Sequence, residues 1–156
     1  MSRDDVDLLL RLLGIDELRE GTEAELVHLF TDPEAAARMD ELIDPDAVIE
    51  FATPDGGFVG DMAGPFRGAD GLRTGWLEWL APWESFIFRR SSWIDIGDGR
   101  VLTLGDSIAR MASGVEVETA VGALYTIRDG RVTRIQHFLD QAQARRAAGL
   151  EPGNSR

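Results

Sequence analysis

The second half of the chain alternates apolar and polar residues in four stretches, which short glycine-containing turns separate. The turn between the last two stretches is Asp129-Gly130, and an Asp-Gly pair between alternating runs is the strongest short-range signal of a β-hairpin. This pattern constrains the fold more than any other feature, because it predicts an antiparallel meander of four strands. The expected strands cover residues 85–96, 100–110, 115–127 and 131–139.

The start of the chain instead places its apolar residues at helical spacing. Gly21 can interrupt the second of the helices expected there. The third can be capped by Thr31 or Asp32, and Asp44-Pro45 ends it. These three helices are expected over about 6–13, 18–30 and 33–43.

The middle of the chain links these helices to the meander. Residues 47–52 are typical of a strand, and the glycine-rich stretch 54–68 is typical of a loop or an irregular hairpin. Helical spacing returns over 69–81, and a last helix is expected over 141–148. Helices, one strand, a helix and then a meander together predict an α+β domain, with helices on one face of a curved sheet.

The length and the charge of the chain limit its organisation and its partners. A chain of 156 residues suits one domain, which we expect over 1–150, with a frayed tail at 151–156. The net charge is −12, and the first 50 positions hold 15 acidic residues against 4 arginines. This acidity disfavours nucleic acid and anionic membranes as partners. No apolar run is long enough for a membrane helix, so we expect a cytoplasmic protein.

Missing residue types exclude several chemistries. Cysteine is absent, which excludes disulfides, thiolate metal sites and cysteine nucleophiles. Lysine is absent as well, since all 16 basic residues are arginine, and this excludes a Schiff-base lysine and a Walker-type phosphate loop. Two histidines, His28 and His137, are too few for a histidine-rich zinc site, so we expect no metal and no other cofactor.

Four segments resemble the pattern of SnoaL-like proteins, in the ketosteroid isomerase and nuclear transport factor 2-like superfamily. The most telling is the last, where Arg-Asp-Gly-Arg-Val-Thr-Arg-Ile precedes Phe-Leu-Asp and later Ala-Gly-Leu. The resemblance covers about 44–150. It implies a cystatin-like cone, with N-terminal helices packed on the concave face of a curved, mostly antiparallel sheet and a pocket between them. The four segments are 44–50, 66–72, 79–83 and 128–150.

The Asp129-Gly130 turn also predicts the register of the last hairpin, since a two-residue turn pairs the residues on either side of it. One face of the hairpin is then formed by three facing pairs. The pairs are Thr126 with Thr133, Leu124 with Ile135, and Gly122 with His137.

The resemblance assigns this face to the pocket, because the side chains that match Ile135, His137 and Leu139 line the pocket of ketosteroid isomerases. His137 is therefore expected in the pocket, where Gly122 leaves room beside its imidazole. Tyr125 is expected on the opposite, convex face.

An apolar row on the convex face must also be covered. A second subunit is the expected cover, which resembles dimerisation in the superfamily, and we therefore expect a homodimer. The row consists of Leu102, Leu104, Ile108, Val121 and Phe138.

Three titratable side chains are candidates for catalysis, namely His137, Asp140 and Glu118. The imidazole of His137 can act as a general acid or base at neutral pH, or it can be a hydrogen-bonded residue without a chemical role. Asp140 lies where an aspartate looks like the catalytic base of SnoaL-like polyketide cyclases. With Gln143 three residues later, it also fits a helix N-cap.

Glu118 joins the pocket face on one register of its strand. The alternative is a structural ion pair with a neighbouring arginine, and the candidates are Arg89, Arg90 and Arg110.

Glu50 flanks the first strand, where ketosteroid isomerases carry their proton-abstracting aspartate. The position that matches this aspartate is Phe51, and the position of the isomerase's oxyanion acid is Leu124. Both departures argue against steroid isomerisation. A tryptophan can roof the pocket and stack on a flat ligand, although helical spacing also suits core residues. The expected ligand-binding residues are Trp76, Trp79, Trp83, Leu124, Ile135, Leu139 and Glu50.

These observations lead to one preferred function and two alternatives. The preferred hypothesis is a SnoaL-like domain that binds a small, largely apolar molecule and performs cofactor-free isomerisation, cyclisation or hydration, with His137 as the lead base and Asp140 in support. The first alternative is a non-catalytic, homodimeric ligand-binding or accessory module. The second is a protein-partner module that uses the acidic helices.

Overall fold

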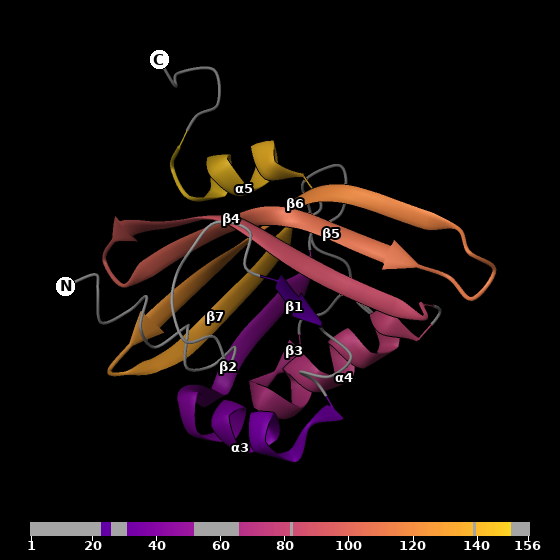
Figure 1. Cartoon of the computed structure of the whole chain (residues 1–156). Helices are drawn as coiled ribbons and strands as arrows, with labels where there is room; N and C mark the ends of the chain where they lie inside the picture. Colours follow the sequence, from indigo (N-terminus) through magenta and orange to yellow (C-terminus); the bar gives the residue numbers. More distant parts are fainter. Residues whose placement is uncertain (1–22, 26–30, 52–65, 82, 139, 151–156) are drawn as a thin grey trace.

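The computed structural model describes residues 23–25, 31–51, 66–81, 83–138 and 140–150. Within these ranges the strands are β1 Glu23–Glu25, β2 Ile43–Phe51, β3 Phe66–Arg67, β4 Ser85–Gly97, β5 Arg100–Arg110, β6 Glu116–Arg128 and β7 Arg131–Phe138. The helices are α3 Pro33–Leu42, α4 Gly68–Leu80 and α5 Gln141–Ala147. The described strands form one sheet in the order β1-β4-β5-β6-β7-β2-β3 (Figure 1). Only β2 and β7 pair in parallel; the other neighbours are antiparallel.

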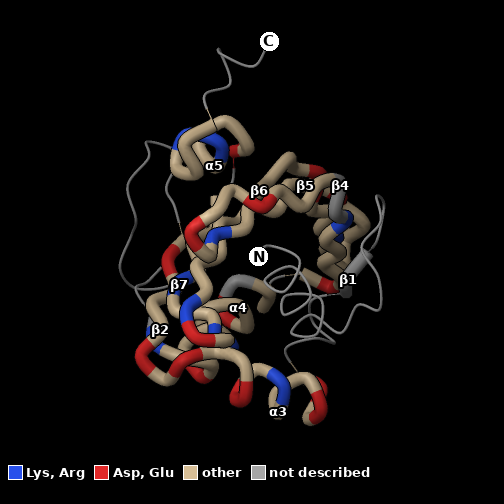
Figure 2. The backbone as a smooth tube through the Cα atoms, turned by 90° about the vertical axis from the view of Figure 1, so that its left-hand side faces the viewer, with Lys and Arg blue, Asp and Glu red and all other residues tan. Residues whose placement is uncertain are grey.

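The expected fold class is confirmed. The meander is present as β4 to β7, and α3 and α4 lie on one face of the sheet while α5 lies on the other (Figure 1). The strands form an arc in end view, so that the face toward α3 and α4 is concave (Figure 2). No described helix is long and apolar enough to span a membrane.

One helix prediction is wrong in part. Residues 23–25, inside the helix expected between Leu18 and Phe30, form strand β1 and pair with residues 87–89 of β4. A sheet edge offers unpaired backbone groups, and satisfying them overrides a local helical pattern. The remainder of that helix, the one at 6–13, the stretch 54–65 and the tail lie outside the described residues.

Helix α3 begins as the sequence predicts. Asp32 is its N-cap, with a carboxylate oxygen that accepts from the backbone N–H of Glu34 at 3.4 Å, and Pro33 follows in the first turn. The helix ends at Leu42, where Ile43 turns extended and starts β2. The acidic residues of α3 are exposed, and their positions along the chain are red in Figure 2.

Helix α4 starts at Gly68, whose φ of 65° lies in the left-handed region that favours glycine. A Cβ at this position would lie 2.8 Å from the carbonyl oxygen of Pro45, so glycine also allows close approach to β2. Leu72, Trp76 and Leu80 recur every four residues and are all buried. This stripe brings Trp76 against the concave face of the sheet.

A β-bulge in β7 changes the register predicted for the last hairpin. The turn pairs Arg128 with Arg131 and Ile127 with Val132, as expected, but Thr126 then faces Arg134. Thr133 is the additional residue of this bulge. The predicted pairs Thr126 with Thr133, Leu124 with Ile135 and Gly122 with His137 are therefore wrong.

Beyond the bulge, Tyr125 faces Ile135 and Ala123 faces His137. Because side chains alternate along a strand, the one-residue shift exchanges the faces assigned to β6. Tyr125 lies on the concave face and Leu124 on the convex face, the reverse of the prediction. The concave assignment of His137 itself is correct.

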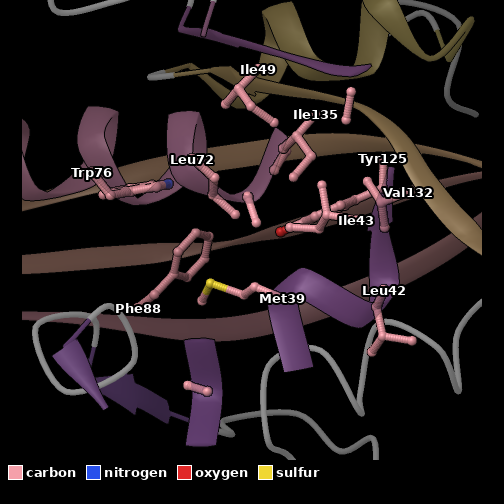
Figure 3. Close-up of a cluster of buried hydrophobic side chains, with 14 of the residues drawn as sticks. Met39, Leu42, Ile43, Ile49, Leu72, Trp76, Phe88, Tyr125, Val132 and Ile135 are labelled. Atoms are coloured by element: carbon pink, nitrogen blue, oxygen red, sulfur yellow. The ribbon is translucent and has the colours of Figure 1, made fainter. Parts of the chain in front are cut away.

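The main core lies between the concave face and the two helices. Met39 from α3 and Leu72 and Trp76 from α4 gather with Tyr125 and Ile135 of the sheet (Figure 3). All five side chains are buried, at 8% exposure or less. This packing fixes α4, and with it Trp76, relative to β6 and β7.

A second, smaller core covers part of the convex face. The residues that pack there are Leu102, Leu104, Leu124 and Phe138, against Ala144 of α5 and its C-cap Ala148. Three residues of the row that predicted dimerisation, Leu102, Leu104 and Phe138, are thus buried within one chain, and Val121 belongs to the concave core.

Gly122 allows α5 to approach the sheet. A Cβ there would lie 2.8 Å from the Cβ of Ala144 and 3.0 Å from the Cδ2 of Leu104. Gly122 therefore makes room for a helix on the convex face, not for the imidazole of His137 as the sequence predicted.

The close contact between β6 and α5 yields a stability prediction. We expect Gly122→Ala to lower the free energy of unfolding by about 1–3 kcal/mol, because the added methyl overpacks the contact. Urea denaturation measures this change. Ala144→Gly removes the opposing methyl at a helix cost of about 1 kcal/mol. The double variant should lose less stability than the sum of the two single changes. Strict additivity would contradict the assignment.

Candidate functional site

One row of side chains crosses the concave face of the sheet at the level of His137. Strand pairing places Trp93 beside Thr103, Thr103 beside Ala123, Ala123 beside His137, and His137 beside Phe51. Of these five residues, Thr103 and Ala123 are small and the other three are aromatic. His137 is therefore the titratable side chain of a row that is otherwise apolar or neutral.

The His137 imidazole is held from two directions. The indole Nε1–H of Trp76 donates a hydrogen bond to Nε2 of His137 at 3.2 Å. The ring of Phe51 stacks on the imidazole, with centroids 4.6 Å apart and an interplanar angle of 14°. Trp76 meets the same imidazole edge-on, at 5.1 Å and 86°.

Two further rings continue this contact. Phe86 lies edge-on to Trp76 at 5.9 Å, and Trp83 lies edge-on to Phe86 at 6.4 Å. We call Phe51, Trp76, Trp83, Phe86 and His137 the aromatic cluster. It joins β2, β4, β7, α4 and the segment before β4, so it depends on the whole fold.

The carboxylates that the sequence singled out lie away from this cluster. The Asp140 carboxylate is the N-cap of α5 and accepts from the backbone N–H of Ala142 at 2.7 Å. Glu118 is exposed and pairs across the strands with Ile108, which places it on the convex side. Its predicted arginine partner Arg110 instead forms an ion pair with Glu116 at 2.9 Å.

Glu50 also points away from the concave face. Its neighbours Ile49 and Phe51 contribute to the concave core, so the side chain between them has the opposite direction. It forms an ion pair with Arg134 at 2.7 Å. Among the described residues, no group of three or more histidine, aspartate or glutamate side chains could hold a metal ion.

A family model described as a SnoaL-like domain matches residues 24–135, which is most of the chain. The chain belongs to the SnoaL-like family. The resemblance inferred from the sequence is thereby confirmed. The comparison with curated proteins found no match.

Solved structures share the fold of this SnoaL-like domain. A putative SnoaL-like polyketide cyclase from Jannaschia sp. CCS1 is 15% identical, with a TM-score of 0.66, over 97% of this chain and 95% of that one. TerC, co-crystallised with polyporic acid, is 16% identical with a TM-score of 0.64, over 94% and 98%. IdmH, a putative polyketide cyclase from Streptomyces antibioticus, is 18% identical with a TM-score of 0.61, over 93% and 98%. At these identities the likeness shows the fold.

The SnoaL-like fold brings together some of the expected ligand-binding residues and separates others. Trp76 and Ile135 lie in the concave core, and Trp83 packs against it. Leu124 belongs to the convex core. The side chain of Trp79 and the whole of Leu139 lie outside the described part of the chain.

Sequence reasoning missed three residues of this site, since Phe51 and Ala123 are neighbours of His137 and Phe86 contacts Trp76. Phe51 reaches His137 through the parallel pairing of β2 with β7, which joins segments far apart in the sequence. Ala123 and Phe86 were also absent from the expected site. The alternation of β6 points to Ala123 only when the bulge at Thr133 is known.

The position of Asp140 in this SnoaL-like domain yields a second prediction. We expect Asp140→Ala to cost about 1 kcal/mol of stability, whereas Asp140→Asn keeps the cap and costs at most a few tenths. Thermal and urea unfolding of the two variants measure the difference. An equal loss of stability in both variants would contradict a capping role. It would mean that Asp140 stabilises the fold through its charge.

Proposed function

We propose that this domain binds a small, largely apolar molecule at the concave face of the sheet, beside the aromatic cluster. The observation that carries the proposal is His137, a polar, titratable ring held by Trp76 and Phe51 among apolar neighbours. Flat aromatic walls favour a planar ligand, and one polar group would orient it.

The relatives support the same class of ligand. One neighbour of the same fold was crystallised with polyporic acid, and two others are described as putative polyketide cyclases. Fold likeness alone does not carry a reaction from one protein to another. It does support a site for small molecules, because the common feature of these descriptions is a small organic molecule.

The chemistry we propose is a cofactor-free acid–base step, such as isomerisation, cyclisation or hydration. His137 would exchange a proton or a hydrogen bond with the ligand. We leave Asp140 and Glu118 out of this step, because the first caps α5 and the second is exposed on the convex side. The alternative, a non-catalytic binding module, uses the same site with His137 as an orienting group.

Ligand binding can be tested with prodan, a neutral, planar, fluorescent naphthyl ketone. We expect saturable binding with a blue-shifted emission, since the probe enters apolar surroundings. His137→Ala should weaken binding about fivefold, as expected for the loss of one ordinary hydrogen bond. Glu118→Gln, a change on the other side of the sheet, is the matched control and should leave the affinity unchanged. Non-saturable binding, or equal affinity in all three proteins, would overturn the proposal.

We also propose that the domain is a homodimer through the part of the convex face that α5 leaves uncovered. Ile87 and Ile108 are neighbours there and are both only half-buried. Arg89 of β4 and Asp106 of β5 lie opposite each other in the next pair of strand neighbours on this face, and Glu118 of β6 lies opposite Ile108. An apolar centre with both signs of charge around it is self-complementary, which suits an interface between identical subunits.

Light scattering at micromolar concentration tests this interface. We expect the mass of a dimer, and we expect Ile108→Arg to give a monomer, because the new charge is buried in the interface. In the single chain the new arginine faces Glu118, so the fold should tolerate it. Val115→Arg, in an exposed position of the β5–β6 turn, is the control and should stay dimeric. A wild-type monomer would refute the proposal. A cytoplasmic location remains a prediction from the sequence.

A further inference from the structure

We propose that Trp76 is a positioning residue that decides which nitrogen of His137 carries the proton. His137 then acts toward a ligand as a hydrogen-bond donor through Nδ1, and not as a base through Nε2. The ligand part of this inference rests on the proposed function. The position of the proton is a property of the chain alone and is tested without a ligand.

The direction of the hydrogen bond follows from the chemistry of the two rings. An indole Nε1–H can only donate, since the indole nitrogen has no available lone pair. At 3.2 Å from this donor, Nε2 of His137 must present its lone pair. The neutral imidazole then carries its proton on Nδ1, because the opposite tautomer would set two N–H groups against each other.

The surroundings keep this arrangement in place. Phe51 stacks on one face of the imidazole, which limits rotation of the ring. Trp76 is itself only 8% exposed and lies edge-on to both Phe51 and Phe86. Trp76 and His137 come from α4 and β7, 61 residues apart, so the tertiary fold sets the distance between them.

The tautomer restricts what His137 can do. A general base needs a free lone pair, and the lone pair at Nε2 is engaged by Trp76. At Nδ1 the nitrogen holds a proton that it can donate. Such a group suits a ligand with an acceptor oxygen, for example a carbonyl or an enolate, within an otherwise apolar molecule.

The nitrogen-15 NMR spectrum of the full chain tests the tautomer. With labelled histidine at a pH where imidazole is neutral, we expect a protonated Nδ1 and an unprotonated Nε2 for His137. The spectrum of His137→Gln assigns the signals, since the chain has two histidines. Trp76→Phe keeps an aromatic ring but removes the donor, and it should abolish this preference. A protonated Nε2 in the wild type would overturn the inference, as would an unchanged tautomer in Trp76→Phe.

A second experiment measures base activity with nitrobenzisoxazole, a planar apolar molecule. A base removes its carbon-bound proton, the N–O bond breaks, and a cyanophenolate forms. Trp76→Phe should raise the His137-dependent rate about fivefold, the factor for releasing one hydrogen bond. Trp83→Phe is the matched control, because this tryptophan contacts Phe86. Equal rates in the two variants would overturn the inference. Failed prodan binding with the expected tautomer would instead count against the proposed function alone.

Discussion

The bulge at Thr133 decides which side chains share the concave face. Without it, the two-residue turn at Asp129-Gly130 would put Leu124 beside Ile135, and Tyr125 would lie on the convex side. With it, Tyr125 joins the core beneath α3 and α4, and Ala123 gives the imidazole of His137 a small neighbour. A single additional residue thus determines both how the core packs and what surrounds the candidate site.

The same shift allows the chain to cover its own convex face. The side chain of Leu124 then points toward α5. Because Gly122 has no side chain, Ala144 of α5 can approach the sheet there. Helix α5 has only seven residues, so it would not be stable by itself. It depends on the Asp140 cap and on packing against the sheet. Outside the contact with α5, the strand neighbours Ile87 and Ile108 remain only half-buried.

Local patterns in the sequence predicted most of this fold. Alternation and the Asp-Gly turn predicted the meander, and Asp32 with Pro33 predicted the start of α3. The errors have two physical causes. One is a contact between segments that are distant in the sequence, and the other is the single extra residue of the bulge. Strand β1 forms because the edge of β4 needs a partner, and nothing in Glu23–Glu25 itself favours a strand over a helix. The structure brings Trp76 to His137 as the sequence suggested, whereas the register shift moves Leu124 to the convex core.

The stability of the fold does not by itself account for the pair formed by Trp76 and His137. Burying a polar nitrogen costs free energy, and the indole N–H compensates for that cost at Nε2. Replacing both partners of such a pair with apolar side chains of the same shape can be nearly neutral. An apolar pair among Phe51, Phe86 and Ile135 would therefore hold α4 against the sheet about as well. What the apolar pair could not do is fix a proton at a defined atom, and this is why we place the function of the domain at this hydrogen bond.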